Sequence, residues 1–472
     1  MLAGLVFGMI STRWLSKHDY ATIRQTFLAY EFAAPLLMLG LPNAVYYFFP
    51  REQGMKRGVI VDNTALLAAG GLLFSLFIAC GGHQLLAMRF DNPDLRHTLS
   101  WLMPYPLIMM PIAGFAAVMV CADRTRTLAV YNVLSSLTLT IASITAVLWT
   151  QSYTAPVVVR IVIPALFLPV AFGLMFKAVP GSLRWPNWTS MQQMVRYSVP
   201  LGLATMLGSI TLQLHAVVVA SLCSPEDFAV YINGAMEIPV ISIVTGSITT
   251  VVFAEMADLC HRGDKKAALD LFHKAAAKSA CILLPTMCFL FVIAEPFILT
   301  LYSDKYYASI LPFRIYLLIL PIRVVVYGSA LMALGMTRVI LVRSAMDLGV
   351  NAILCFIFVE LTGYLGAAIA IIVTLYSWTV PYNLVKIGHG FGVRWHECLP
   401  VRDLFRILTI SLICTPFPLM ALFLSNSYLS VFIGSLLYWP LVCCLLWHYK
   451  YLAVPECVVS VSKRMRTCLN AF

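Results

Sequence analysis

The sequence reads S-K-H-D-Y-A at Ser16–Ala21 and S-P-E-D-F-A at Ser224–Ala229, about two hundred residues later. Each copy lies in a short polar loop, and each is followed by a glutamate within a long hydrophobic stretch, Glu31 in the first case and Glu237 in the second. Self-similarity over a long interval indicates that the chain is built from two related halves.

The rest of the chain is a nearly continuous series of hydrophobic stretches. Of its 472 residues, 61% are hydrophobic and 11% are charged, whereas about 25% are charged in soluble proteins. Because a helix needs about 20 apolar residues to cross a bilayer, the sequence predicts about fourteen membrane spans. Their expected ranges are 2–14, 20–49, 58–80, 99–121, 127–149, 155–177, 198–220, 230–254, 277–303, 310–334, 338–360, 364–386, 405–425 and 427–449.

The Lys and Arg residues of the loops predict the orientation, because short cytoplasmic loops carry an excess of them. If the loop at 50–57 is cytoplasmic, most of the 32 basic residues fall inside. The outside then holds Arg13, Lys17, Arg89, Arg96 and Lys305, with Arg24 near the outer boundary. We therefore expect both termini, including a basic C-terminal tail, in the cytoplasm. This bias accounts for the net charge of +11, so we expect no nucleic-acid partner.

The interval between the two copies of the repeat contains six predicted spans. The expected fold is therefore an all-α polytopic membrane protein with two six-helix lobes, related by a pseudo-two-fold repeat, and two extra C-terminal helices. The N-lobe is expected at 1–180 and the C-lobe at 181–390, with the last two spans and the tail at 391–472. Transporters built from repeats bind their substrate between the two halves.

Several stretches carry a family resemblance. M-L-G-L-P-N-A-V-Y-Y-F-F-P at Met38–Pro50 follows the first copy of the repeat, and D-F-A-V-Y-I-N-G-A at Asp227–Ala235 continues the second. Further similar stretches lie at Ala254–Ala268, Asp304–Arg314 and Gly363–Ala370. Over nearly its whole length the chain resembles the Wzx-type oligosaccharide-lipid flippases of the multidrug/oligosaccharidyl-lipid/polysaccharide exporter superfamily.

The resemblance implies a transporter rather than an enzyme, alternating between inward-open and outward-open states in the bacterial inner membrane. Its implied cargo is an undecaprenyl-pyrophosphate-linked oligosaccharide repeat unit, used for surface polysaccharides such as O-antigen. The implied partners are this lipid-linked substrate, membrane lipids, and a polymerase with other assembly proteins. The resemblance implies no ATP site, and the chain lacks the G-x-x-x-x-G-K-[ST] motif. We expect no cofactor or metal, and coupling to a proton or sodium gradient stays open.

Charged side chains inside membrane spans are costly and usually functional. The candidates for a substrate-binding cavity are Arg24, Glu31, Arg160, His215, Glu237, Arg323 and Asp347. Arg24 and Glu31 are seven residues apart, so they share one face of a helix. Arginine forks bind pyrophosphate with paired hydrogen bonds, and nearby carboxylates could orient them or carry coupling protons.

Alternatives to these assignments stay open. Arg24, Arg160 and Arg314 are charged residues within spans that could instead extend to the outer lipid headgroups. Arg323 and Asp347 lie near the middle of neighbouring spans, where they could form a structural ion pair instead of binding substrate. His215 could equally be a hydrogen-bonded packing residue. Asp62 lies near the inner end of its span, and we expect it at the membrane interface.

Two other functions compete with the flippase. A drug/cation antiporter of the same superfamily would favour an acidic cavity, whereas these spans hold several arginines. A membrane-embedded polysaccharide polymerase or transferase would be expected to have a large outer loop and paired catalytic carboxylates, and neither is evident. We therefore expect no catalytic residues.

Overall fold

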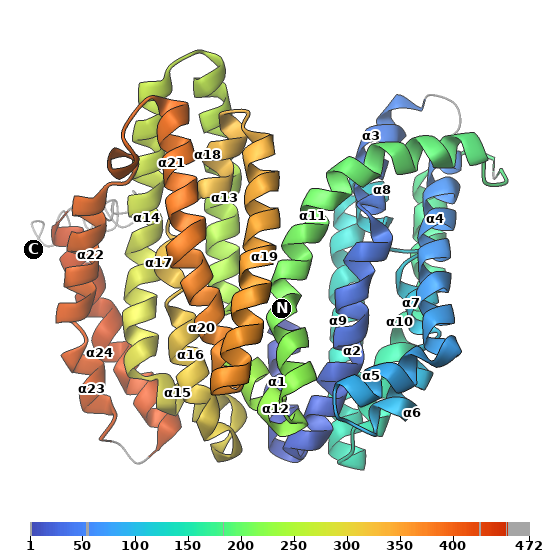
Figure 1. The fold of residues 1–472 in the computed structure, drawn as a ribbon, viewed down its shortest axis with the longest axis horizontal. Coiled ribbons are helices and arrows are strands. Elements are labelled where there is room, and N and C mark those ends of the chain that lie inside the picture. Colours follow the sequence, from blue (N-terminus) through green and yellow to red (C-terminus); the bar gives the residue numbers. More distant parts are fainter. Residues whose placement is uncertain (1, 53–55, 183, 424–425, 450, 452–472) are drawn as a thin grey trace, which may run out of the picture. The chain divides into compact units, whose positions relative to one another are not determined.

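The computed structural model describes residues 2–52, 56–182, 184–423, 426–449 and 451. Within these ranges the chain folds into helices and forms no strand (Figure 1), which confirms the all-α prediction. Ten helices in the same ranges are long and apolar enough to cross a membrane, as expected of a multi-pass membrane protein. The exact number of fourteen spans stays a prediction. The basic tail after residue 451 lies outside the described residues.

Some predicted spans are single helices. These are α1 (Leu2–Trp14), α9 (Thr125–Thr150), α10 (Thr154–Ala178), α11 (Trp188–Leu222), α19 (Thr337–Thr362) and α24 (Ser427–His448).

The other spans are interrupted. In the first half of the chain they comprise α2 (Lys17–Met38) with α3 (Leu41–Arg51), α4 (Lys56–Phe77) with η1 (Ile78–Gly82) and α5 (His83–Arg89), and α6 (Leu95–Leu102) with α7 (Tyr105–Met109) and α8 (Phe115–Cys121). In the second half they comprise α12 (Pro225–Gly234) with α13 (Pro239–His261), α14 (Lys265–Val292) with α15 (Ala294–Tyr302), and η2 (Asp304–Ser309) with α16 (Ile310–Leu317), α17 (Leu320–Arg323) and α18 (Tyr327–Ala333). They also comprise α20 (Tyr364–Thr374) with η3 (Leu375–Thr379) and α21 (Val380–Phe391), and α22 (Val401–Ile413) with α23 (Pro416–Ala421). The short helix η4 (Trp395–Cys398) lies between two predicted spans.

Residue contacts divide the chain into two compact units. Unit 1 comprises Met1–Ala235, Tyr302–Ser309 and Leu341–Thr374, and unit 2 comprises Met236–Leu301, Ile310–Ile340 and Leu375–Phe472. The lobe boundaries expected at residues 180 and 390 stay predictions.

The two copies of the sequence repeat begin helices in the same way. Ser16 precedes α2, and its Oγ accepts a hydrogen bond from the N–H of Asp19 at 3.0 Å and donates one to the Asp19 carboxylate at 2.7 Å. Ser224 precedes α12 and makes the same two bonds with Asp227, at 3.1 and 2.9 Å. A serine that satisfies a free N–H of the first turn is a strong helix-start signal, so the repeat encodes a helix cap.

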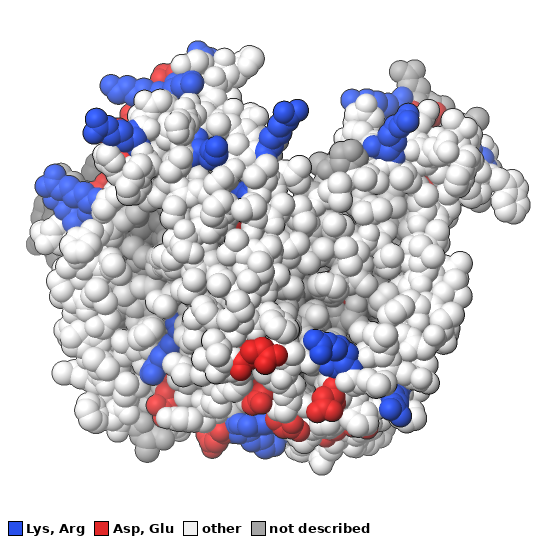
Figure 2. Space-filling view, in the orientation of Figure 1, with Lys and Arg blue, Asp and Glu red and all other residues white. Residues whose placement is uncertain are grey.

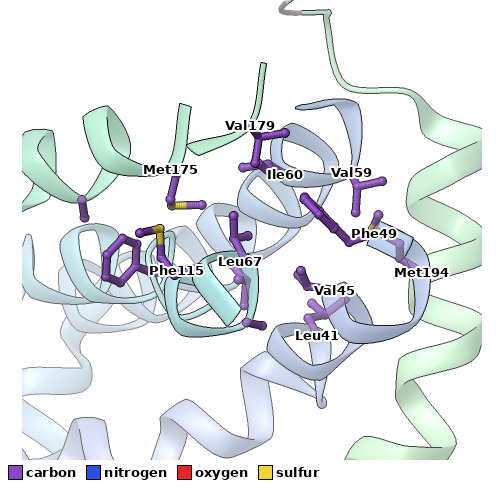
Figure 3. Close-up of a cluster of buried hydrophobic side chains, with 14 residues drawn as sticks. Leu41, Val45, Phe49, Val59, Ile60, Leu67, Phe115, Met175, Val179 and Met194 are labelled. Carbon is purple, nitrogen blue, oxygen red and sulfur yellow. The ribbon is translucent and has the colours of Figure 1, made fainter. Parts of the chain in front are cut away.

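A hydrophobic core in unit 1 surrounds α3 (Figure 3). Leu41, Val45 and Phe49 project from α3 toward Val59, Ile60 and Leu67 of α4. Further members of the core come from α8, α10, the residue after α10, and α11: Phe115, Met175, Val179 and Met194.

A sharp break separates α2 from α3 and sets the direction of α3. Leu39 and Gly40 have φ values of 44° and 74°, which end one helix and start the next. The backbone of α11 passes directly against this break, where a Cβ on Gly202 would collide with the carbonyl oxygen of Leu39. Glycine is therefore required at this crossing, because any side chain would push α11 away.

Asp62 is completely buried within the protein, and its expected position at the depth of the membrane interface stays a prediction. Its Oδ2 is 2.5 Å from Nη2 of Arg184, and its Oδ1 accepts a hydrogen bond from the N–H of Asn187 at 2.8 Å. The segment between α10 and α11 covers the start of α4, and Arg57 holds it further by donating to the carbonyl oxygens of Val179 and Phe176. Tertiary packing thus removes Asp62 from water.

We predict that Asp62→Ala destabilises the protein by about 2–3 kcal/mol, because it leaves a half-buried arginine without its partner. Asp258→Ala is the matched control, since its ion pair with Arg262 lies on the surface and such pairs contribute about 0–1 kcal/mol. Thermal denaturation of the two purified variants measures the difference. Equal, small losses in both would contradict the buried role of Asp62.

Basic residues gather at one end of each unit. In Figure 2, Lys and Arg cluster near the loop joining α13 to α14 in unit 2, and near the loop joining α3 to α4 in unit 1. Asp and Glu lie mostly toward the opposite end. This asymmetry within each unit matches the loop charges from which the orientation was predicted.

We predict that reporter domains fused after Lys386 and after the last residue, Phe472, are both cytoplasmic, as the charge asymmetry requires. Paired phosphatase and fluorescent-protein fusions distinguish the two sides of the membrane. A periplasmic signal from either position would refute the orientation.

Candidate functional site

Three of the predicted site residues come together in unit 1. Helix α2 carries Arg24 and Glu31 two turns apart on one face, and α10 contributes Arg160. The charges of these three side chains interact with one another. Helix α11 adds Gln213, whose Nε2 lies 3.4 Å from Oε2 of Glu31. We call these four residues the arginine cluster.

Aromatic rings hold one arginine of this cluster. The guanidinium carbon of Arg160 lies 5.1 Å from the ring centre of Phe7 and 4.8 Å from that of Phe27. Tyr105 packs edge-on against Phe27 and Tyr30, at 5.4 and 5.0 Å between ring centres. Contact with a ring face stabilises a guanidinium without using its N–H groups.

The two arginines of the cluster have N–H groups that donate to no side chain among the described residues. Within the part of the chain that the structure describes, neither Arg24 nor Arg160 forms an ion pair or a side-chain hydrogen bond. Each guanidinium has five N–H donors. Two guanidinium charges face the single carboxylate of Glu31, so the cluster is net cationic and can bind an anion bidentately.

A different arrangement holds Arg323 and Glu237 in unit 2. Nη1 of Arg323 donates to Oε1 of Glu237, and Ser242 donates to the same oxygen at 2.7 Å. Glu237 lies in the interruption between α12 and α13, and Arg323 ends α17 just before the next interruption. Both side chains line a cavity of about 30 Å³ together with Ile241 and Tyr316, enough for one water molecule.

The possible pairing of Arg323 with Asp347 was wrong. Glu237 is the partner of Arg323, while Oδ2 of Asp347 lies 3.5 Å from Nε of Arg343, one turn earlier in α19. Residues four apart on a helix are neighbours. The partner of Asp347 therefore comes from its own helix, whereas the partner of Arg323 comes from a distant segment of unit 2.

His215 lies in the contact between α11 and α12. It is 8% exposed, is hydrogen-bonded to the backbone of Thr211, and packs edge-on against Tyr231 at 5.9 Å between ring centres. This location fits the packing role that the sequence left open.

One polar side chain of the cluster was missed by sequence reasoning. Gln213 was overlooked although it is an amide within a predicted span, which is itself a signal. In unit 2, the guanidinium carbon of Arg314 lies 5.7 Å from the ring centre of Phe291. Its Nε is buried and has no hydrogen-bond partner among the described residues.

We predict that Arg323→Ala and Glu237→Ala each reduce the yield of monodisperse protein, because each leaves one charge of the pair uncompensated. The double variant should recover most of that loss. Size-exclusion chromatography measures the yield, with the double variant Arg343→Ala/Asp347→Ala as a second ion-pair control. Single variants that behave like the wild type would rule out a structural role for the pair.

Comparisons with solved structures identify proteins that have a similar fold. The solved structure of the lipid II flippase MurJ in an inward closed conformation matches with a TM-score of 0.75, at 13% identity over 95% of this chain and 97% of that chain. An inward-facing multidrug resistance MATE family transporter of the MOP superfamily matches with a TM-score of 0.64, at 14% identity over 86% and 95%. The chain therefore has the same fold as these two proteins. No curated protein sequence matches it.

The sequence itself gives the family. A family model described as "Polysaccharide biosynthesis protein" matches residues 10–311, which is more than half of the chain. The protein belongs to this polysaccharide biosynthesis family.

Proposed function

We propose that the protein is a flippase that moves an undecaprenyl-pyrophosphate-linked oligosaccharide repeat unit across the bacterial inner membrane by alternating access, for assembly of a surface polysaccharide such as O-antigen. The observation that carries this proposal is the arginine cluster, in which two guanidinium charges share the single carboxylate of Glu31. Membership of the polysaccharide biosynthesis family and a fold shared with a lipid II flippase support it.

The charge balance favours an anionic cargo over a cationic drug. An arginine within a membrane helix is costly, by about 2.5–3.5 kcal/mol at the centre and less toward the ends, and an ion partner offsets that cost. Arg24 and Arg160 share only Glu31, so at least one positive charge is left for a ligand. A pyrophosphate fits such a site, whereas a cationic drug would be repelled.

An apolar groove in unit 1 suits the hydrocarbon part of the cargo. It encloses about 620 Å³ between α2, α4, α5, α11 and α19. Its lining is apolar except for Arg89 and Ser221, and it includes Phe32, Phe77 and Phe356. We assign the polyprenyl tail to this groove because α2 and α11 contribute to both the groove and the arginine cluster.

The remaining parts of the proposal follow from a flippase role. The protein works in the inner membrane with both termini in the cytoplasm, and a polymerase with other assembly proteins uses the unit that it delivers. A proton or sodium gradient supplies the energy.

We predict that cells lacking the protein accumulate lipid-linked repeat units on the inner leaflet and lose the surface polymer. Arg24→Ala and Arg160→Ala should each reduce recovery of the polymer about tenfold or more, the effect of losing one or two charge-assisted hydrogen bonds. Arg24→Lys should be intermediate, because it keeps the charge and loses the planar fork. Arg126→Ala, on the exposed first turn of α9, is the control.

Two results would overturn this proposal. If polymerisation fails while single units still reach the outer face, the protein is a polymerase or transferase. If cells lacking the protein instead become sensitive to cationic drugs and keep their polymer, it is a drug antiporter.

A further inference from the structure

His18 lies between two carboxylates at one end of unit 1. Its Nε2 is 3.0 Å from Oδ2 of Asp94, which precedes α6, and its Nδ1 is 3.4 Å from Oε1 of Glu226 in the first turn of α12. Water reaches all three side chains, which are 35%, 37% and 49% exposed. Each ring nitrogen therefore faces an anionic oxygen at a site open to protons.

The contact joins equivalent positions of the internal repeat. His18 is the third residue of S-K-H-D-Y-A, and Glu226 is the third residue of S-P-E-D-F-A. The start of α2 and α12 pack side by side (Figure 1), and the Tyr20 hydroxyl donates to Oδ1 of Asn233 at 2.9 Å just inside. The histidine of one copy thus meets the glutamate of the other where the two copies touch.

The two contacts of His18 differ between the neutral and the charged ring. A neutral imidazole carries one N–H and one lone pair, whereas the imidazolium carries an N–H on both nitrogens. In a neutral His18, the ring nitrogen without a proton would direct its lone pair at the carboxylate of either Asp94 or Glu226. That carboxylate would repel it. We propose that His18 is a proton-binding site, and that the bound proton holds the two copies of the repeat together through Asp94 and Glu226.

The other charged groups around His18 already have partners. Asp19 and Asp227 bond to the capping serines Ser16 and Ser224. Lys17 lies over the ring of Tyr306, and Lys305 donates to the carbonyl oxygens of Arg13 and Leu15. Tyr153 is hydrogen-bonded to Asp94, and burial and that carboxylate raise the pKa of Tyr153. Tyr153 therefore stays neutral, and its hydroxyl stabilises the charged form of the Asp94 carboxylate beside His18.

This site has a consequence for coupling. The loop charges predict that this end of unit 1 faces the outside, so the occupancy of the site follows the outer pH. A proton that binds one conformation better than another shifts the population toward it. The proposal itself rests on the geometry of unit 1 and does not depend on what the protein transports.

Hydrogen exchange of the purified full-length protein tests the site without a transport assay. Exchange of the amides in segments 16–21 and 224–229 is measured at several pH values between about 5 and 8, the range in which histidine changes charge. The wild type is compared at each pH with His18→Arg, which is cationic throughout, and with His18→Gln, which is never charged. His97→Gln, at an exposed position of α6, is the control.

At low pH the wild type should exchange like His18→Arg, and at high pH like His18→Gln. The expected difference between the two limits is about three- to tenfold, the size that two partly exposed ion pairs supply. Glu226→Gln should reduce the pH effect even if His18→Arg folds poorly. If the ratio of wild-type exchange to that of His18→Gln stays constant with pH, or if His97→Gln removes the effect, the proposal is wrong.

Discussion

A charged side chain in hydrocarbon is costly, and the contacts of the charged residues within the predicted spans reflect that cost. Most of the charges that the sequence places within spans have found an ion partner: Asp62 with Arg184, Glu237 with Arg323, and Asp347 with Arg343. These pairs need no ligand to explain them. Arg24 and Arg160 differ, because they share one carboxylate and keep their N–H donors unused among the described residues. That contrast separates charges that hold helices together from charges available to an anion.

Helix interruptions give the pairs and the cluster their positions. The break at Leu39 and Gly40 turns the chain where α11 passes, and the absence of a side chain at Gly202 lets the helices touch. The same crossing of α2 and α11 brings Gln213 to Glu31. In unit 2, interruptions near Glu237 and Arg323 place both side chains beside a small cavity. Interruptions in the helices therefore position polar side chains in ways that a continuous apolar helix could not.

Sequence reasoning succeeded where the signal was local or compositional. Hydropathy identified the helical membrane fold, and the copies at Ser16–Ala21 and Ser224–Ala229 proved to be matching helix caps. The seven-residue spacing of Arg24 and Glu31 was enough to place them on one face of α2. Partners from distant segments were harder to predict: Arg184 for Asp62, Glu237 for Arg323 and Asp94 for His18 depend on tertiary packing. The interruptions within spans were also missed, because apolar composition does not change at them.

We propose that the arginine cluster binds the pyrophosphate of a lipid carrier. The binding of undecaprenyl pyrophosphate to the purified protein in detergent tests this role, when compared with the binding of undecaprenol, which has the same tail and no phosphate. The wild type should prefer the pyrophosphate by about tenfold or more, the effect of a charge-assisted bidentate contact, and Arg24→Ala/Arg160→Ala should abolish the preference. Equal preference in the wild type and this double variant would show that the cluster does not bind the pyrophosphate.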